Sequence, residues 1–225
     1  MVELEKNKVY CMDAEELLSY FPDNKNIVII TDPPYGINLD LKWLSEMNLA
    51  EQKQPNKSDC KIINDNKPFD ARHLFNYKRR LIFGHPYIYD ENATGWIIWD
   101  KQPKINERCI VTPVEMASTT LRTGFDIFRV MWGGYMRDLD FGEDRYEHPT
   151  QKPLKLLKRI IEKFTKPTDL IIDPYCGSGS TLVACKKMGR NFVGGDIEQR
   201  YVNLANKILS QTYLDKSRQE ILCLN

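Results

Sequence analysis

The sequence of 225 residues carries 32 lysine and arginine residues against 31 aspartate and glutamate residues, a formal net charge of +1. This balance excludes binding to nucleic acid through a global basic field, so any nucleic-acid surface must be a local patch. A hydrophobic content of 42% with 28% charged residues is ordinary for a soluble globular protein and suits one α/β domain over residues 1–225.

The six cysteines are scattered without a paired C-x-x-C, and only three histidines are available to complete a metal site. We therefore expect reduced thiols and no metal. No apolar run approaches the roughly 20 residues that span a bilayer, and no signal-peptide core follows the charged N-terminus. The expected protein is cytoplasmic and makes no membrane contact.

The first predicted elements are a strand over 9–11 and a helix over 13–20, with Asp13 as a candidate N-cap. An apolar β-branched run over 27–30 then predicts a buried strand, which Asp32-Pro33-Pro34 stops abruptly. A loop therefore follows this strand directly.

That loop, which continues to Tyr35 and Gly36, has the composition of a site for a planar amino group. Pro33 and Pro34 remove two N–H donors, so the backbone there offers carbonyl acceptors only. An exocyclic amino group of a base can donate one hydrogen to Asp32 and the other to a loop carbonyl, while Tyr35 covers the base. Because Asp and Pro favour turns anywhere, the motif taken alone is also compatible with an ordinary turn that has no binding role.

The middle of the chain begins with a polar segment, 37–68, that has little periodicity. We expect a long mobile surface segment there, a candidate lid or substrate-contacting loop. A basic cluster that includes Arg79 and Arg80 follows and is interpreted as a solvated helix end. Helices are predicted over 69–77 and 154–164, and strands over 81–84, 95–100, 114–119 and 127–132.

A second strand, loop and helix lie between 169 and 188. The strand ends at Asp173, and the helix is expected to start at Leu182. Between them, Gly177 and Gly179 let a ligand approach the backbone, and the start of the helix supplies free N–H groups. Asp173 can meet a cationic or hydroxyl group, so the unit predicts a cofactor cradle.

The next predicted strand, 191–195, ends in Asp196. Its spacing from Asp173 is close to the roughly 20 residues that separate a glycine fingerprint from the ribose-binding acid of nucleotide folds. The full G-x-G-x-x-G and the Gly-Lys-Ser/Thr of a P-loop are both missing, which argues against pyrophosphate and ATP hydrolysis. A nucleoside with a cationic tail fits better.

With these motifs the chain resembles the β class of DNA amino-methyltransferases, which place the Asp-Pro-Pro-Tyr motif before the S-adenosylmethionine motif. The resemblance spans nearly the whole chain and implies a Rossmann-like methyltransferase fold with a doubly wound, mostly parallel sheet. Tyr175 stands where the family usually has Phe, Ser180 replaces a common Thr, and Asp196 stands where Glu is frequent. Five blocks carry the resemblance: TDPPYG at 31–36, GWIIWDK at 95–101, HPTQKP at 148–153, DPYCGSGST at 173–181 and VGGDIEQRY at 193–201.

The resemblance implies that S-adenosylmethionine is the cofactor, with its ammonium at Asp173 and its ribose at Asp196. Asp13 resembles the acid that similar proteins set near the cofactor's adenine, and it is equally well placed as an N-cap. Lys152 is the expected partner of the methionine carboxylate. The full set of candidate cofactor-binding residues is Asp13, His148, Lys152, Asp173, Tyr175, Gly177, Ser178, Gly179 and Asp196.

The implied reaction is methylation of adenine N6 in DNA, with the base flipped out and stacked on Tyr35. Cytosine in DNA, adenine in RNA and a protein glutamine remain open as other amino substrates. Relatives that act on cytosine often show Ser, and glutamine methyltransferases show Asn, where this chain has Asp32. RNA-directed relatives more often end the motif with Trp. A non-catalytic binding module would show a broken loop, whereas Asp32, Pro33, Pro34 and Tyr35 form an intact set of candidate catalytic residues.

Target recognition is expected from two insertions, 37–68 and 101–147. Because these insertions are too small for a large recognition domain, the target sequence could be short, or recognition could involve a partner or a homodimer. Because Asp32 and Asp173 both follow short apolar strands, the two loops are expected to meet at the carboxyl edge of one sheet.

Overall fold

The computed structural model describes residues 3–38, 64–101, 112–131 and 151–223, with side chains up to residue 212. Within these residues one eight-stranded sheet runs in the order β1-β8-β7-β2-β3-β5-β4-β6. The strands are β1 (Lys8–Cys11), β2 (Ile27–Thr31), β3 (Arg80–His85), β4 (Gly95–Asp100), β5 (Val114–Thr119), β6 (Gly124–Arg129), β7 (Leu170–Asp173) and β8 (Asn191–Asp196).

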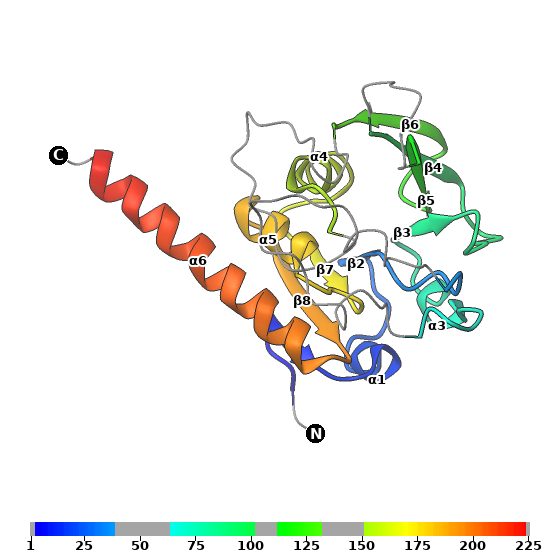
Figure 1. Ribbon diagram of the computed structural model, residues 1–225, viewed down its shortest axis with the longest axis horizontal. Helices are drawn as coiled ribbons and strands as arrows, with labels where there is room; N and C mark the ends of the chain where they lie inside the picture. Colours follow the sequence, from blue (N-terminus) through cyan, green and yellow to red (C-terminus); the bar gives the residue numbers. More distant parts are fainter. Residues whose placement is uncertain (1–2, 39–63, 102–111, 132–150, 224–225) are drawn as a thin grey trace, which may run out of the picture.

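Helices cover both faces of this sheet. One hydrophobic core packs α4, α5 and α6 against it, and a second core packs α1 and α3 against the opposite face. In Figure 1 the long helix α6, drawn orange to red, passes beside β8 and continues beyond the sheet. None of the described helices has the length and apolarity needed to cross a bilayer. The helices are α1 (Ala14–Ser19), α3 (Arg72–Phe75), α4 (Leu154–Phe164), α5 (Ser180–Lys187) and α6 (Gln199–Cys223).

Strand β2 shows why the sequence of a central strand is a continuous apolar run. Val28 and Ile30 belong to the core beneath α4, α5 and α6, whereas Ile27 and Ile29 belong to the core beneath α1 and α3. All five residues of β2 are buried. A strand covered on both faces needs apolar side chains at every position, so alternation disappears.

The topology confirms the predicted doubly wound, mostly parallel sheet. Strands β1, β8, β7, β2 and β3 run parallel, β5 is antiparallel to both neighbours, and β6 runs parallel to β4. The chain leaves β2 towards β3 on one side and leaves β7 towards β8 on the other. The β2 and β7 loops therefore flank a topological switch point, where open α/β sheets bind ligands.

Two predicted element boundaries in the middle of the chain are wrong. The expected helix over 69–77 is reduced to the single turn Arg72–Phe75, because the Asp70 carboxylate accepts the Arg72 N–H at 3.1 Å and the helix starts only there. The strand expected over 127–132 is Gly124–Arg129, because its register with β4 already begins at Gly95 and Gly124. Trp132 lies outside the described residues.

The interpretation of the basic cluster as a solvated helix end is wrong for Arg79 and Arg80. Arg79 makes a two-pronged ion pair with Asp169, at 2.7 and 2.8 Å. Arg80 opens strand β3, is 3% exposed and pairs with Asp90. Arg80 is buried and Arg79 is half-buried, and each is paired with a carboxylate from another part of the chain.

Candidate functional site

The Asp32 and Asp173 loops meet, as expected from the positions of their strands. Strands β2 and β7 pair in parallel with Ile29 opposite Ile172, so both loops leave the same edge of the sheet. The hydroxyl of Thr31, one residue before Asp32, donates to Asp173 Oδ1 at 2.7 Å. One hydrogen bond therefore joins the end of β2 to the end of β7.

Asp32 holds two polar partners within the site. The Tyr35 hydroxyl donates to Asp32 Oδ1 at 2.5 Å, and the Lys152 ammonium contacts Asp32 Oδ2. Removal from water raises the pKa of Asp32, and the Lys152 charge offsets only part of this effect. Asp32 is thus a carboxylate whose negative charge depends on a neighbouring cation.

The cation beside Asp32 belongs to a chain of alternating charges. Lys152 Nζ lies 3.2 Å from Glu115 Oε2, and Lys101 Nζ lies 2.6 Å from Glu115 Oε1. Burial opposes ionisation of Glu115, but Lys152 and Lys101 outweigh it and lower the pKa of Glu115. Burial also opposes the charge on Lys152, yet Asp32 and Glu115 raise its pKa well above the ordinary value. Lys152 therefore stays charged while it bridges two carboxylates.

The sequence analysis missed Glu115 and Lys101. Lys101 closes the GWIIWDK block, but a charged residue after a strand has no distinctive pattern. Glu115 lies on β5, and its register opposite Trp99 on β4 becomes known only from the sheet. For Lys152, the expected contact with a cofactor carboxylate stays a prediction, and His148 lies outside the described residues.

A buried carboxylate fixes the backbone that follows the two prolines. Asp65 is 3% exposed, and its Oδ1 accepts the N–H groups of Tyr35, Gly36 and Ile37 at 3.0, 2.8 and 3.3 Å. Asp65 falls inside the segment 37–68, which was expected to be a mobile surface segment. At this residue the expectation is wrong, because three charge-assisted hydrogen bonds tie it to the loop. Residues 39–63 lie outside the described residues.

The Tyr35 ring is positioned by contacts on the strand β3 side. A Cβ on Gly84 would lie 2.5 Å from Tyr35 Cε1, so only glycine leaves room for the ring. Tyr87 stacks on Tyr35 with ring centroids 5.7 Å apart and planes 16° from parallel. The Tyr35 ring is therefore positioned by the backbone of β3 and by a second aromatic ring.

Asp173 is an acid buried at the switch point. It is 3% exposed, and besides Thr31 it accepts the Tyr175 N–H at 3.3 Å. Burial raises the pKa of Asp173 to about 7, because hydrogen bonds from Thr31 and Thr181 recover only part of the lost hydration. The ionised form of such a buried carboxyl is stabilised strongly by a cation placed against it.

The glycine loop turns sharply into α5. Gly177 and Gly179 have φ angles of +50° and +81°, a region that favours glycine, and Gly179 is the N-cap of α5. A Cβ on Gly179 would lie 2.8 Å from the Cβ of Ala205, so this glycine also permits close packing of α6. Ser178 is 2% exposed, with its hydroxyl 3.3 Å from that of Ser180.

Asp196 and Asp13 lie at the neighbouring ends of β8 and α1. Asp196 Oδ2 accepts the Gly177 N–H at 3.0 Å, and its backbone carbonyl accepts the Met12 N–H at 3.2 Å. Burial raises the pKa of Asp196. The N-cap assignment of Asp13 is confirmed, since its Oδ1 accepts the N–H groups of Glu15 and Glu16. The two acids and the glycine loop thus share one edge of the sheet.

Tyr175 is joined to two aromatic side chains that the sequence analysis did not single out. Its hydroxyl lies 2.8 Å from His73 Nε2, and Phe69 meets its ring edge to face at 5.4 Å. Burial lowers the pKa of His73, which favours the neutral ring that accepts the tyrosine hydrogen. The partner explains how the hydroxyl of Tyr175 is accommodated at this position.

This chain is similar to known proteins in sequence and in fold. A family model described as DNA methylase, of the N6/N4 methyltransferase type, matches residues 27–207. The Type II methyltransferase M2.MboI of Moraxella bovis is 26% identical over 256 residues, covering 95% of this chain and 93% of that relative. The Type II methyltransferase M1.MboII of Moraxella bovis is 48% identical over 64 residues, but the match covers 28% of this chain and 25% of that relative.

Among solved structures, the crystal structure of the M1.HpyAVI-SAM complex superposes with a TM-score of 0.50 at 21% identity. The match covers 90% of this chain and 98% of that one. At this identity the likeness concerns the fold. It confirms the Rossmann-like methyltransferase fold expected from the sequence.

Proposed function

The chain belongs to the DNA methylase family of N6/N4 amino-methyltransferases, and from this premise we propose that it transfers a methyl group from S-adenosylmethionine to N6 of adenine in DNA. The observation that carries the proposal is the Asp32 carboxylate, held between Tyr35 and Lys152 where the β2 loop meets the β7 loop. The Type II relatives favour a place in restriction and modification.

The residues at the switch point fit S-adenosylmethionine, the cofactor of the family. Asp173, buried and short of hydration, suits the ammonium of its methionine part. Lys152, the expected partner of the carboxylate, and the N–H groups at the start of α5 suit the carboxylate, and Asp196 suits the ribose hydroxyls. Asp13 and Tyr175, from neighbouring loops, suit the adenine end. When bound, this cofactor supplies an electrophilic methyl group on a sulfonium sulfur.

Asp32 acts on the amino group of the target base. The nitrogen lone pair is delocalised into the ring, so the nitrogen is a poor nucleophile until hydrogen bonds to its two hydrogens localise the lone pair on it. Hydrogen bonds to Asp32 and to a carbonyl of the proline loop orient the lone pair towards the incoming methyl group. Each carboxylate oxygen can accept a second hydrogen bond, so Asp32 can bind the amino group beside Tyr35 and Lys152.

Methylation leaves a positive charge on the amino nitrogen, which then loses a proton. Asp32, which binds the amino group in this proposal, can accept that proton, and its raised pKa suits transient acceptance. Lys152 limits the rise, because its charge keeps Asp32 ionised before the reaction. Asp65 holds the loop backbone in position throughout.

The experiment that tests the proposal is incubation with tritiated S-adenosylmethionine and unmethylated DNA, followed by nucleoside analysis. Tritium in N6-methyladenine is the expected result. Label in N4-methylcytosine would replace the adenine assignment within the same family. RNA and a glutamine-containing peptide, offered under the same conditions, should remain unlabelled.

Affinity for S-adenosylmethionine is expected to rise with pH up to about 7, the pKa of Asp173. Below this pH the carboxyl is protonated and cannot pair with the ammonium, so binding must release a proton. Well below the pKa the affinity should change about tenfold per pH unit. Calorimetric titrations from about pH 5.5 to about pH 7 measure this slope.

The matched variant for this measurement is Asp173→Asn, which keeps the shape of the side chain and removes its titration. Its affinity should be weaker at neutral pH and nearly independent of pH over the same interval. An unchanged slope in the variant would assign the titration to another group.

Replacing Asp196 by alanine is expected to weaken S-adenosylmethionine binding by about 1.5 to 3 kcal/mol, the typical worth of hydrogen bonds to a charged group. The ribose loses its acceptor, and the Gly177 N–H loses its partner at 3.0 Å. Calorimetry measures the loss, with Glu198→Gln as a control on the same loop. Wild-type affinity in Asp196→Ala would place the nucleoside elsewhere.

A further inference from the structure

The loop between β3 and β4 presents two exposed tyrosines next to the Asp32 site. Tyr87 is 61% exposed and Tyr89 is 75% exposed. They alternate with two buried residues, Ile88 at 4% and Asp90 at 6%. The loop is therefore anchored at every second residue while its aromatic rings face solvent.

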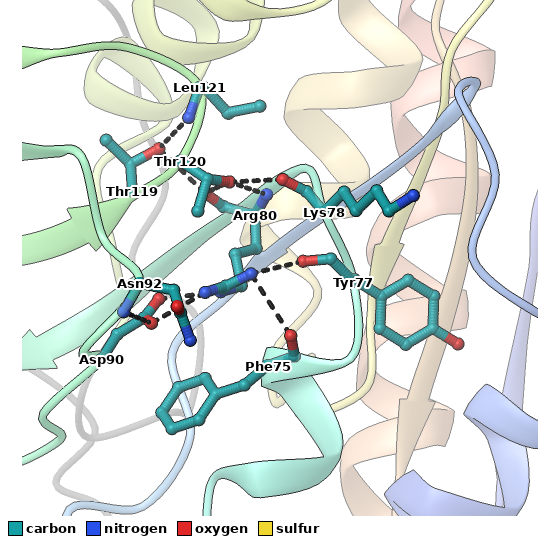
Figure 2. Close-up of polar contacts among 9 residues, drawn as sticks. All are labelled: Phe75, Tyr77, Lys78, Arg80, Asp90, Asn92, Thr119, Thr120 and Leu121. Carbon is teal, nitrogen blue, oxygen red and sulfur yellow. Dashed lines mark hydrogen bonds and ion pairs between the residues drawn. The ribbon is translucent and has the colours of Figure 1, made fainter.

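The anchor at Asp90 is a buried ion pair with Arg80, shown in Figure 2. Arg80 Nε and Nη2 donate to the two oxygens of Asp90 at 2.7 Å each, and the Asn92 N–H donates to Asp90 Oδ1 at 3.0 Å. Arg80 Nη1 also donates to the carbonyl of Tyr77 at 2.6 Å. A buried guanidinium with several hydrogen bonds of this kind leaves the loop little freedom to move.

Of the two tyrosines, Tyr87 has a direct connection to the proposed catalytic loop. Its ring is nearly parallel to that of Tyr35, with 5.7 Å between centroids, which is the geometry of an offset stack. Tyr35 Cε1 and Cδ1 also lie close to Gly84 on β3. Tyr87 thus extends the aromatic surface of Tyr35 outward from Asp32 to the solvent.

We propose that Tyr87 binds an unpaired nucleobase of the DNA substrate by stacking, so that Tyr35 and Tyr87 form one continuous platform for extrahelical nucleotide. This inference rests on the proposed function and extends its substrate site. Because every base has a π face, such a contact adds affinity for unpaired DNA without reading its sequence. An uncharged ring also matches a chain whose net charge is only +1.

The rigid anchor favours a base-stacking role for Tyr87 over the alternative that Tyr87 is simply a tyrosine exposed to solvent. A ring that is 61% exposed, stacked on a second ring and mounted on a buried ion pair is already ordered before any ligand arrives. A preorganised aromatic contact loses little side-chain entropy on binding. The charged groups of the anchor point inward and do not compete for the DNA.

The test measures binding of fluorescein-labelled single-stranded oligodeoxyadenylate by fluorescence anisotropy, with sinefungin present to fill the cofactor site. Tyr87→Ala should weaken binding on the order of tenfold, the scale of one lost base stack. Tyr87→Phe should retain wild-type affinity. Tyr89→Ala, a matched tyrosine in the same loop, should stay within about twofold of wild type.

An abasic strand of the same length separates stacking from phosphate contacts, and the wild type and Tyr87→Ala should bind it equally. Equal affinities of the two proteins for oligodeoxyadenylate would overturn the proposal, as would an equal loss in Tyr89→Ala. Thermal melting of each variant shows whether it is folded. If the wild type failed to produce N6-methyladenine, this result would count against the proposed function and not against the Tyr87 contact. The contact would then be measured with oligodeoxycytidylate in place of oligodeoxyadenylate.

Discussion

Replacing Asp32 by alanine is expected to abolish methyl transfer to DNA, with a fall on the order of 10³-fold or more, while S-adenosylmethionine binding stays within a few-fold of wild type. Asp32 addresses the amino group of the base, so its loss removes the orientation of the nucleophile and the acceptor for its proton. Tritium transfer and calorimetric titration measure the two properties separately.

The variant should still fold, because Lys152 keeps its contact with Glu115 at 3.2 Å. Asp32→Asn tests charge apart from shape and should also be severely impaired. Asp70→Asn is the control, since Asp70 is an exposed carboxylate whose partner is the surface residue Arg72. If Asp32→Ala lost cofactor binding and methyl transfer to the same degree, Asp32 would belong to the cofactor site.

Replacing Lys152 by methionine is expected to lower the free energy of unfolding by about 3 kcal/mol, because it leaves Asp32 and Glu115 without their shared cation. This is the lower end of the range for a broken buried pair, since the two carboxylates retain 22% and 29% side-chain exposure. Urea unfolding at neutral pH measures the loss.

The pH dependence of Lys152→Met provides a second readout. Without the cation the folded-state pKa values of Asp32 and Glu115 should rise, so folding then favours their protonated forms. The deficit should therefore be smallest at acid pH and grow as pH rises through those pKa values. Adding Asp32→Asn and Glu115→Gln should restore most of the stability. A deficit that does not change with pH would mean that lost packing, not uncompensated charge, destabilises the variant.

The position of the two main loops could be predicted from sequence. Apolar runs end at Thr31 and Asp173 in the structure, and the rule that parallel strands open their loops at one edge brings Asp32 next to Asp173. The helix over Leu154–Phe164 and the strands over Gly95–Asp100 and Val114–Thr119 have the predicted bounds. These patterns depend on a residue's immediate neighbours, and so a single sequence shows them.

The burial of charged residues could not be predicted in this way. A run of Lys and Arg before β3 reads as a solvated helix end, but Arg80 is buried because Asp90 faces it across the loop. Helix α6, from Gln199 to Cys223, was not predicted, because its sequence has weak amphipathic character.

By itself, then, the sequence determined the strand ends, the proline loop, the glycine loop and the acids that follow the strands, because each is a local pattern of apolar runs and breakers. Only the tertiary structure decided which side chains complete the site: Glu115 and Lys101 around Lys152, Asp65 beneath the Tyr35 backbone, and His73 on Tyr175. These partners come from segments far apart in the chain. Their pairing follows from strand register and from the need of buried charges and polar groups for partners, and neither is encoded in local spacing.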